Sequence, residues 1–397
     1  MDELFSCRAF AGFGPNRLEP GPPPPLFRAR GSRPAALRRR IRQHCPRAPG
    51  VYGMIDANGA LVYVGKAKCL RARLLSYFRK KSRDPKAGRI VEQARAVVWE
   101  ESACEFAALL RELELIRRWQ PRFNVQGQPK RCGRRYVCLG RRPAPHAFLA
   151  PQPPAGVTAC FGPVPAGRKA GEAVRRLNDL FRLRDCPRAQ VMVFADQQEL
   201  FAQPRAAGCL RHEIGTCLGP CAAVCTQADY AAQVRAARAF LEGKDAGPLE
   251  ALERDMTAAA AALEYERAAD LRDRAAVLRW LLKEVGRVRA ARQRHSFVYP
   301  VAGADGTERW YLIRHGRVTA AAAAPRDAET ARAAAALVEA AARGGAAEPG
   351  PPAPEEVDGV LLVAAWFRRH PEERARVLTW DEARARCAAC LPSGPRP

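Results

Sequence analysis

The sequence is short of acidic residues. It has 41 Asp and Glu against 66 Lys and Arg, which leaves a formal net charge of +25 over 397 residues. A biased genome composition explains arginine in place of lysine, but it does not explain the missing acids. A positive surplus of this size predicts a polyanionic partner, and nucleic acid is the usual one.

Long apolar runs are also missing. No stretch approaches the roughly 20 apolar residues of a membrane-spanning helix, and the longest run of low polarity, at 319–324, is mostly alanine. Residues 1–5 lack the basic segment and apolar run of a secretory signal. We therefore expect a cytoplasmic, nucleoid-associated bacterial protein with no membrane partner.

The 14 cysteines come without any sign of a secretory signal. We expect them to be thiols or metal ligands rather than disulfides. Thiolates in sets of four suit Zn²⁺ or a 4Fe–4S cluster, although the paired C-x₂-C knuckles common in zinc sites are absent. Reduced structural thiols are the alternative. The cysteines that crowd together are Cys186, Cys209, Cys217, Cys221 and Cys225.

The composition along the chain predicts several regions. Residues 1–44 form a basic Pro/Arg-rich leader with little core of its own. Two short strands and a helix over 105–119 are predicted within a first domain at 45–130. The segment 131–228 is expected to be a linker region with the cysteine cluster, and two helices form a hairpin within 245–285. Residues 295–397 carry a strand hairpin at 296–313, an alanine-rich helix and a last small element, with no assigned role.

The two strands of the first domain each carry a tyrosine beside glycines, in Gly50-Val51-Tyr52 and Tyr63-Val64-Gly65. The Asn58-Gly59 turn between them is typical of a tight hairpin, so Tyr52 and Tyr63 are expected to converge. Arg73 and Tyr77 follow at a spacing of four and share one helix face. Phenols and cations on one hairpin and helix predict a site that handles phosphate.

A phosphate site of this kind needs a metal ligand, and Glu112 flanks the apolar stripe of the predicted 105–119 helix. Mg²⁺ commonly keeps several waters and takes one or two carboxylates together with phosphate oxygens. For an isolated glutamate, a solvated helix residue is the better interpretation.

Together these residues, with 66–68 (Lys-Ala-Lys) and 121–124 (Pro-Arg-Phe-Asn), resemble the GIY-YIG nuclease domain, most closely that of the UvrC excinuclease family. The resemblance implies that Glu112 holds Mg²⁺ or Mn²⁺ and that Arg73 steadies the scissile phosphate. It implies that Tyr52, Tyr63, Lys66 and Tyr77 position or activate water and that Asn124 supports the site. Tyr63 is our preferred general base and Tyr52 the alternative. The expected DNA contacts are Lys66, Lys68, Arg71 and Arg73.

The same family has an iron–sulfur cluster after its nuclease domain, so the resemblance implies a 4Fe–4S cluster on Cys186, Cys209, Cys217 and Cys221. Cys225 is a possible substitute for Cys186, and zinc is the alternative metal. The helical hairpin resembles the UVR motif, which pairs with the helicase subunit UvrB. Without the resemblance, a hairpin packed on its own protein is favoured. The expected partner-binding residues are Leu252, Met256, Leu263, Tyr265, Leu271 and Leu278.

The implied fold is α/β: a small GIY-YIG domain with a three-stranded, mainly antiparallel sheet, then the cysteine region, the two-helix hairpin and a C-terminal α+β region. The implied function is a metal-dependent DNA endonuclease of nucleotide-excision repair. Beyond His295 we find no second set of catalytic aspartates and no helix-hairpin-helix motifs, so one incision centre is expected. In this the chain resembles the short Cho-type homologues, which generally lack the UVR motif, and that resemblance implies a single incision on the 3′ side of a lesion in a UvrB-bound duplex. The alternatives are a stand-alone structure-specific or mobile-element nuclease and a non-catalytic adaptor between DNA and UvrB.

Overall fold

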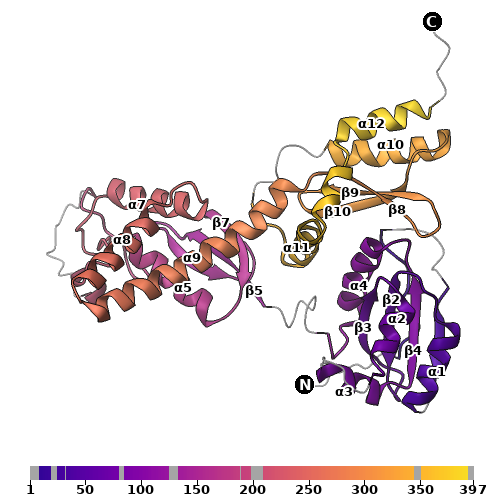
Figure 1. Cartoon of the computed structure of the whole chain (residues 1–397). Helices are drawn as coiled ribbons and strands as arrows, with labels where there is room; N and C mark the ends of the chain where they lie inside the picture. Colours follow the sequence, from indigo (N-terminus) through magenta and orange to yellow (C-terminus); the bar gives the residue numbers. More distant parts are fainter. Residues whose placement is uncertain are drawn as a thin grey trace, which may run out of the picture. The chain divides into compact units, whose positions relative to one another are not determined.

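The computed structural model describes residues 9–18, 25–31, 33–79, 85–124, 133–187, 189–197, 209–343 and 350–391. The chain divides into two compact units (Figure 1). Unit 1 comprises Met1–Cys132, Ala291–Ala347 and Asp358–Pro397, and unit 2 comprises Gly133–Ala290 and Glu348–Val357. Among the described residues, no helix combines the length and the apolar character needed to cross a membrane.

The first part of unit 1 is built on a four-stranded antiparallel sheet. Its strands are β1 (Phe27–Arg30), β2 (Gly50–Ile55), β3 (Leu61–Ala67) and β4 (Ala96–Glu101), in the order β1-β4-β2-β3. The β2–β3 turn forms as predicted: Asp56 accepts hydrogen bonds from the amides of Asn58 and Ala60, and Gly59 has a φ of +79°. The α/β class is confirmed, with one strand more than the three expected.

The extra strand comes from the segment that we expected to be a leader. β1 closes one edge of the sheet, and α1 (Pro34–His44) buries Leu37 and Ile41 against the same face as α2 (Leu70–Ser76). On the opposite face, Phe10 and Phe13 pack with α4 (Glu105–Trp119). The described residues before position 44 therefore contribute to the core because their apolar side chains cover both faces of the sheet.

α4 forms over the predicted residues. The Cys104 side chain accepts a hydrogen bond from the Ala107 amide at its start, and Gln120 adopts a left-handed conformation before Pro121 at its end. Its most buried polar residue is Arg111, which donates hydrogen bonds to the Glu100 carboxylate and to backbone carbonyls of the N-terminal segment. This buried ion pair is fully hydrogen-bonded, as a charge out of water requires, and it ties residues 14–15 to α4.

The C-terminal part of unit 1 is an antiparallel sheet of three strands with helices on it. β8 (Phe297–Ala302), β9 (Glu308–Arg314) and β10 (Arg317–Ala323) form the sheet in the order β10-β9-β8. α10 (Ala328–Ala342) and α12 (Trp380–Ala389) contribute to its core, and α11 (Pro354–Arg369) and a 3₁₀ turn (Pro371–Arg376) complete this part. Within unit 1, Phe106 of α4 packs edge-to-face against Tyr299 and Tyr311.

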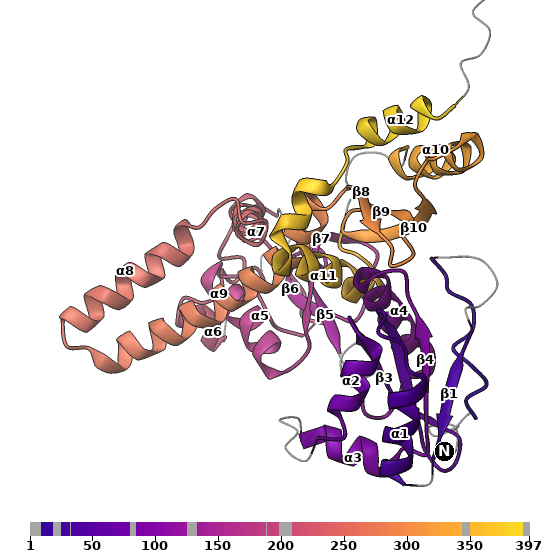
Figure 2. The same cartoon turned by 45° about the vertical axis from the view of Figure 1, so that its right-hand side comes forward.

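Unit 2 contains more regular structure than a linker. β5 (Arg134–Gly140), β6 (His146–Ala150) and β7 (Val157–Pro165) form an antiparallel sheet in the order β6-β5-β7. α5 (Arg168–Leu180) and α7 (Gln227–Leu241) share a hydrophobic core with it, and the short α6 (Leu210–Glu213) lies in the cysteine region. α8 (Gly247–Ala261) and α9 (Tyr265–Arg294) follow as the predicted helical hairpin (Figure 2).

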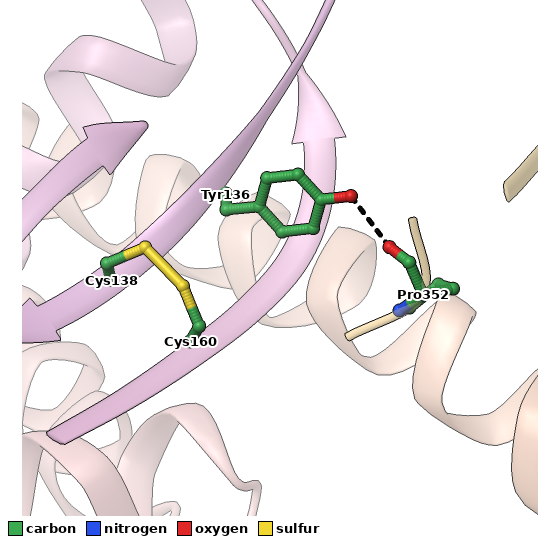
Figure 3. The surroundings of a disulfide bond; sticks show 4 residues. All are labelled: Tyr136, Cys138, Cys160 and Pro352. Carbon is green, nitrogen blue, oxygen red and sulfur yellow. Dashed lines mark hydrogen bonds between the residues drawn. A yellow bond between two sulfur atoms is a disulfide. The ribbon is translucent and has the colours of Figure 1, made fainter. Parts of the chain in front are cut away.

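The second face of this sheet holds a disulfide. Cys138 on β5 and Cys160 on β7 are paired across the strands and bonded through their sulfurs (Figure 3). Beside them, the Tyr136 hydroxyl donates a hydrogen bond of 2.6 Å to the Pro352 carbonyl. Our expectation that the cysteines are thiols or metal ligands is therefore wrong for these two, because cross-strand register places them face to face.

Candidate active site

Tyr52 lies at the centre of the predicted site. It stands opposite Gly65 in the β2–β3 register, and its ring is fully buried. A Cβ on Gly65 would lie 2.5 Å from the Tyr52 hydroxyl oxygen, so no larger residue fits at this position without moving the ring. Gly65 on β3 therefore makes room for the ring of Tyr52 on β2.

The predicted tyrosines and arginine meet around this ring. The Tyr52 and Tyr77 hydroxyl oxygens are 2.9 Å apart, and Arg73 Nε donates to the Tyr52 hydroxyl at 3.3 Å. Arg73 Nη2 reaches the Tyr77 hydroxyl at 3.5 Å. The Tyr63 ring lies 6.2 Å from that of Tyr52 and 6.3 Å from that of Tyr77, centroid to centroid. The three phenols and the guanidinium thus form one cluster.

The electrostatics of the cluster keep the phenols protonated. Burial raises the pKa of Tyr52, Tyr63 and Tyr77 above the usual phenol value, and repulsion between neighbouring phenolates raises each pKa further. The positive charge of Arg73 opposes this rise at all three. Tyr52 is fully buried, whereas Tyr63 is partly exposed, so Tyr63 is the phenol of this pair that a water molecule can reach.

Glu112 enters the site from α4. Its Oε1 accepts a hydrogen bond of 3.1 Å from the Lys66 amide at the end of β3. Burial raises the pKa of its carboxyl to about 7, against the opposing positive charges of Lys66 and Arg73. A half-buried carboxylate with few hydrogen-bond donors is a fitting ligand for a divalent cation, which would replace the proton it otherwise holds near neutral pH.

Two predicted residues support the strands rather than face the phenols. Asn124 clamps β3: its Oδ1 accepts from the Val64 amide at 2.9 Å and its Nδ2 donates to the Val64 carbonyl at 2.8 Å. The Lys66 ammonium pairs with Glu105 at 2.9 Å. We had not singled out Glu105, and only its place about two helical turns before Glu112 relates it to the site.

The expected DNA contacts differ in their surroundings. Lys68 is exposed at the end of the β2–β3 hairpin, and Arg73 is also exposed beside the phenols. Arg71 is partly buried and donates through Nε to the Cys45 carbonyl, while its amide donates to the Pro46 carbonyl at 3.1 Å. Arg71 therefore joins the start of α2 to the segment after α1.

Comparison with protein-family models shows which known proteins the chain resembles. Residues 48–125 match the UvrC-like GIY-YIG domain, residues 136–240 the UvrC/Cho excinuclease middle domain, and residues 247–279 the UvrB/uvrC motif. Over these three segments, the chain is similar to UvrC proteins. The resemblance stated from the sequence is confirmed.

Curated relatives agree. The chain is 35% identical over 236 residues to the UvrABC system protein C of Alcanivorax borkumensis, which is 59% of this chain and 37% of that protein. It is 38% identical over 231 residues to that of Desulforudis audaxviator, with 58% and 36% covered. The chain thus spans just over a third of the length of these UvrC proteins.

Solved structures also match at the nuclease domain. One is described as the GIY-YIG N-terminal endonuclease domain of UvrC from Thermotoga maritima bound to its catalytic divalent cation, magnesium. It is 34% identical to this chain, covers 22% of this chain and 96% of its own, and has a TM-score of 0.21. A second is a point mutant of the same domain, 32% identical with the same coverage and TM-score.

The UvrC-like middle region holds the cysteine cluster. Cys217 and Cys225 are buried, and Cys186, Cys209 and Cys221 are partly exposed. Burial raises the pKa of the Cys217, Cys221 and Cys225 thiols, and nearby thiols raise each further. Among the described residues, no three His, Cys, Asp or Glu side chains are arranged to hold a metal ion. The donor types suit a cluster, but their arrangement does not fit a single-metal site.

The UVR-like hairpin presents only part of the expected partner surface. Leu263 and Tyr265 flank its turn and are 68% and 67% exposed. Leu252 and Met256 are partly buried on α8. Leu271 and Leu278 are buried, and Leu278 belongs to the hydrophobic core of unit 2. In this structure the tip of the hairpin is accessible, while part of its apolar stripe packs on its own protein.

Proposed function

We propose that the protein is a metal-dependent DNA endonuclease of nucleotide-excision repair that makes one incision, on the 3′ side of a lesion, in a UvrB-bound duplex. The observation that carries this proposal is the cluster of Tyr52, Tyr77 and Arg73 beside a half-buried Glu112. An adaptor that only bridges DNA and UvrB needs no such cluster.

The residues have distinct tasks in this proposal. Glu112 would hold a Mg²⁺ or Mn²⁺ ion, which when bound supplies charge stabilisation at the phosphate and acidifies water. The Arg73 guanidinium faces the phenols and offsets negative charge on the phosphoryl group in the transition state. Tyr52 and Tyr77 hold Arg73 in place through their hydroxyl oxygens. Asn124 keeps β3 in register.

Tyr63 accepts the proton of the attacking water in this scheme. It is the partly exposed phenol, whereas the hydroxyl of Tyr52 is already shared between Tyr77 and Arg73. Because burial raises the pKa of Tyr63, its hydroxyl keeps its proton at neutral pH in the isolated protein. Tyr63 can act as a base only after that proton has passed to solvent, and a divalent cation held by Glu112 would favour the resulting phenolate.

Two partner and cofactor assignments accompany the nuclease proposal. The exposed Leu263 and Tyr265 are the first points of contact for a UvrB-like helicase subunit. Cys186, Cys209, Cys217 and Cys221 would ligate a 4Fe–4S cluster, with Cys225 as a substitute. Zinc, the alternative metal, would require the described thiols to rearrange, because as they lie they do not form a single-metal site. Support comes from N–H donors to two of the sulfurs, from the Gly219 amide to Cys217 and from Arg184 to Cys186, both at 3.5 Å.

A nicking assay tests the proposal. The wild-type chain should nick duplex DNA with Mg²⁺ or Mn²⁺, and Glu112→Gln should lower the rate by about a thousandfold or more, as expected for loss of a metal ligand and its charge stabilisation. Glu92→Gln, on the exposed side of α3 (Pro85–Gln93), removes the same charge outside the site and should cut at the wild-type rate. Equal cutting by wild type and Glu112→Gln, or no cutting by any of them, would reject the nuclease.

A further inference from the structure

We propose that the outer face of α1 binds the phosphate backbone of the DNA duplex beside the cut. This inference rests on the proposed nuclease function. The helix buries Leu37 and Ile41. Its exposed residues include four arginines and no acid, and we call them the α1 arginine face: Arg38, Arg39, Arg40 and Arg42.

Most of the charge on this face is not balanced within the helix. Arg42 lies in the last turn, where a cation is favourable, but Arg38 stands four residues before it, where like charges repel. α1 has no acidic residue in its first turn, so its dipole is not compensated there. Within the described part of the chain, no ion pair links these four arginines to a carboxylate. A face with four positive charges and no carboxylate partner among the described residues suits an external polyanion.

Several exposed arginines elsewhere in the chain are paired with a carboxylate. Arg238 pairs with Glu242 four residues on at 2.7 Å, and Arg376 pairs with Glu373 at 3.1 Å. Arg279 of the hairpin helix pairs with Glu253. The α1 arginine face differs because it gathers four exposed arginines on one short helix that has no acidic residue.

The position of α1 links this face to the cutting site. α1 and α2 lie side by side on the sheet face that carries the tyrosines (Figures 1 and 2). The Leu70 amide at the start of α2 donates to the Ala48 carbonyl at 2.9 Å, just after α1 ends. Arg73 then lies on α2. Packed helices are about 8–10 Å apart, which equals roughly three base pairs of duplex at 3.4 Å each.

Duplex DNA is the occupant that this placement favours over an acidic protein segment. A phosphodiester held at Arg73 brings the neighbouring phosphates of its own duplex across α2 and onto α1, and the exposed Arg47 continues the positive charge between the two helices. Contacts of this kind position a duplex without reading its bases. The face should therefore raise affinity equally for all sequences.

Duplex binding measured against salt tests this inference. In the Glu112→Gln background, which binds without cutting, R38Q/R39Q/R42Q should weaken binding at least about tenfold at low salt. It should also lower the slope of log affinity against log salt by roughly 2–3, since each phosphate contact contributes about 0.9. Glutamine is a good helix former, so the helix should persist.

Two matched variants complete the design. R238Q/R279Q/R376Q removes the same total charge from paired positions and should leave the slope unchanged. R38K/R39K/R42K keeps the charges and should restore most of the affinity. An unchanged affinity and slope in R38Q/R39Q/R42Q would overturn the inference and point to an acidic protein segment. If the wild-type chain still cuts DNA while R38Q/R39Q/R42Q binds unchanged, only the α1 inference fails and the proposed function stands. If the wild-type chain neither binds nor cuts duplex DNA, the proposed function itself is rejected.

Discussion

The site around Tyr52 and the region of the five cysteines differ in how far the fold alone assembles them. Tyr52, Tyr77 and Glu112 come from three elements spread over 60 residues, yet hydrogen bonds join their surroundings without any ligand. The five cysteines lie within 40 residues of sequence, but among the described residues they form no group of three that is arranged for a metal ion. Strand register and helix packing assemble the first site. For the second, we propose that a bound cofactor would order the thiols, since metal binding is commonly coupled to folding.

Gly65→Ala is expected to break the preassembled site with the largest effect. The added Cβ would lie 2.5 Å from the Tyr52 hydroxyl oxygen, so the ring must shift, and a displacement of about 1 Å in a catalytic site costs about a hundredfold in rate. Overpacking should also cost about 1–3 kcal/mol of unfolding free energy. Nicking assays and urea unfolding measure both effects.

Gly88→Ala is the matched control. Gly88 lies in α3, and among the described residues no neighbouring atom stands within 4 Å of the position that a Cβ would take. The substitution should stabilise the chain by about 0.4–1 kcal/mol. If Gly65→Ala cut at the wild-type rate, the tight fit of Tyr52 over Gly65 would have no catalytic role.

The cysteine region should respond to cofactor removal, and the tyrosine site should not. The anaerobically purified wild-type protein should be brown from bound iron, and C217S/C221S should lose this colour. Hydrogen exchange at the amides of Gly219 and Ala223 should rise by at least about tenfold in that variant, since the ligand no longer orders the loop. Exchange at the Val64 amide should stay unchanged. C69S, outside the cluster, is the control.

Two results would contradict this contrast. A colourless, zinc-loaded wild-type protein would reject the iron–sulfur assignment. Equal exchange in C217S/C221S and wild type would show that the fold alone orders the cysteine region, as it does the tyrosine site.

The pH dependence of the unfolding free energy tests whether the Glu112 carboxyl is buried as described. Its carboxyl has an ordinary pKa of 4.5 and a folded pKa of about 7. Between these values the folded protein holds a proton that the unfolded chain releases, so the unfolding free energy falls as pH rises through this window. The loss is at most about 3 kcal/mol. In metal-free buffer, the stability gain of Glu112→Gln over wild type should grow from pH 4.5 to 7 and then level off.

Urea unfolding at each pH checks this, with Glu92→Gln as the control that removes an exposed carboxylate. Added Mg²⁺ should remove the difference at about pH 8, because the ion compensates the buried charge. A stability difference between Glu112→Gln and wild type that does not vary with pH would show that the carboxyl is not buried as described.

Local patterns in the sequence predicted the hairpin, α4 and the convergence of Tyr52 with Tyr63. Asn58-Gly59 fixes the turn, and register then fixes the partners. The strand β10 was not predicted, because its alanines carry no strand preference and become a strand only by pairing with β9. β1 was missed for the same reason: its place at the sheet edge depends on pairing with β4, 66 or more residues away.

Within the candidate site, too, some contacts could be predicted from the sequence and others could not. The cluster of phenols with Arg73 was predictable because motif residues on adjacent strands and one helix face must converge. The ion pair of Lys66 with Glu105 and the burial of Leu278 were not, since both depend on how helices pack on distant strands. The Cys138–Cys160 disulfide follows from register between β5 and β7, which no local pattern reveals.

The most direct test of the central claim is a map of incision on an end-labelled, lesion-bearing duplex loaded with a UvrB-like helicase subunit. The predicted result is a single nick 3′ to the lesion by the wild-type chain, absent with Glu112→Gln and kept at the wild-type level with Glu92→Gln. Nicks on both sides of the lesion, or a 3′ nick that survives in Glu112→Gln, would contradict one metal-dependent cutting centre built on Tyr52, Tyr63 and Glu112.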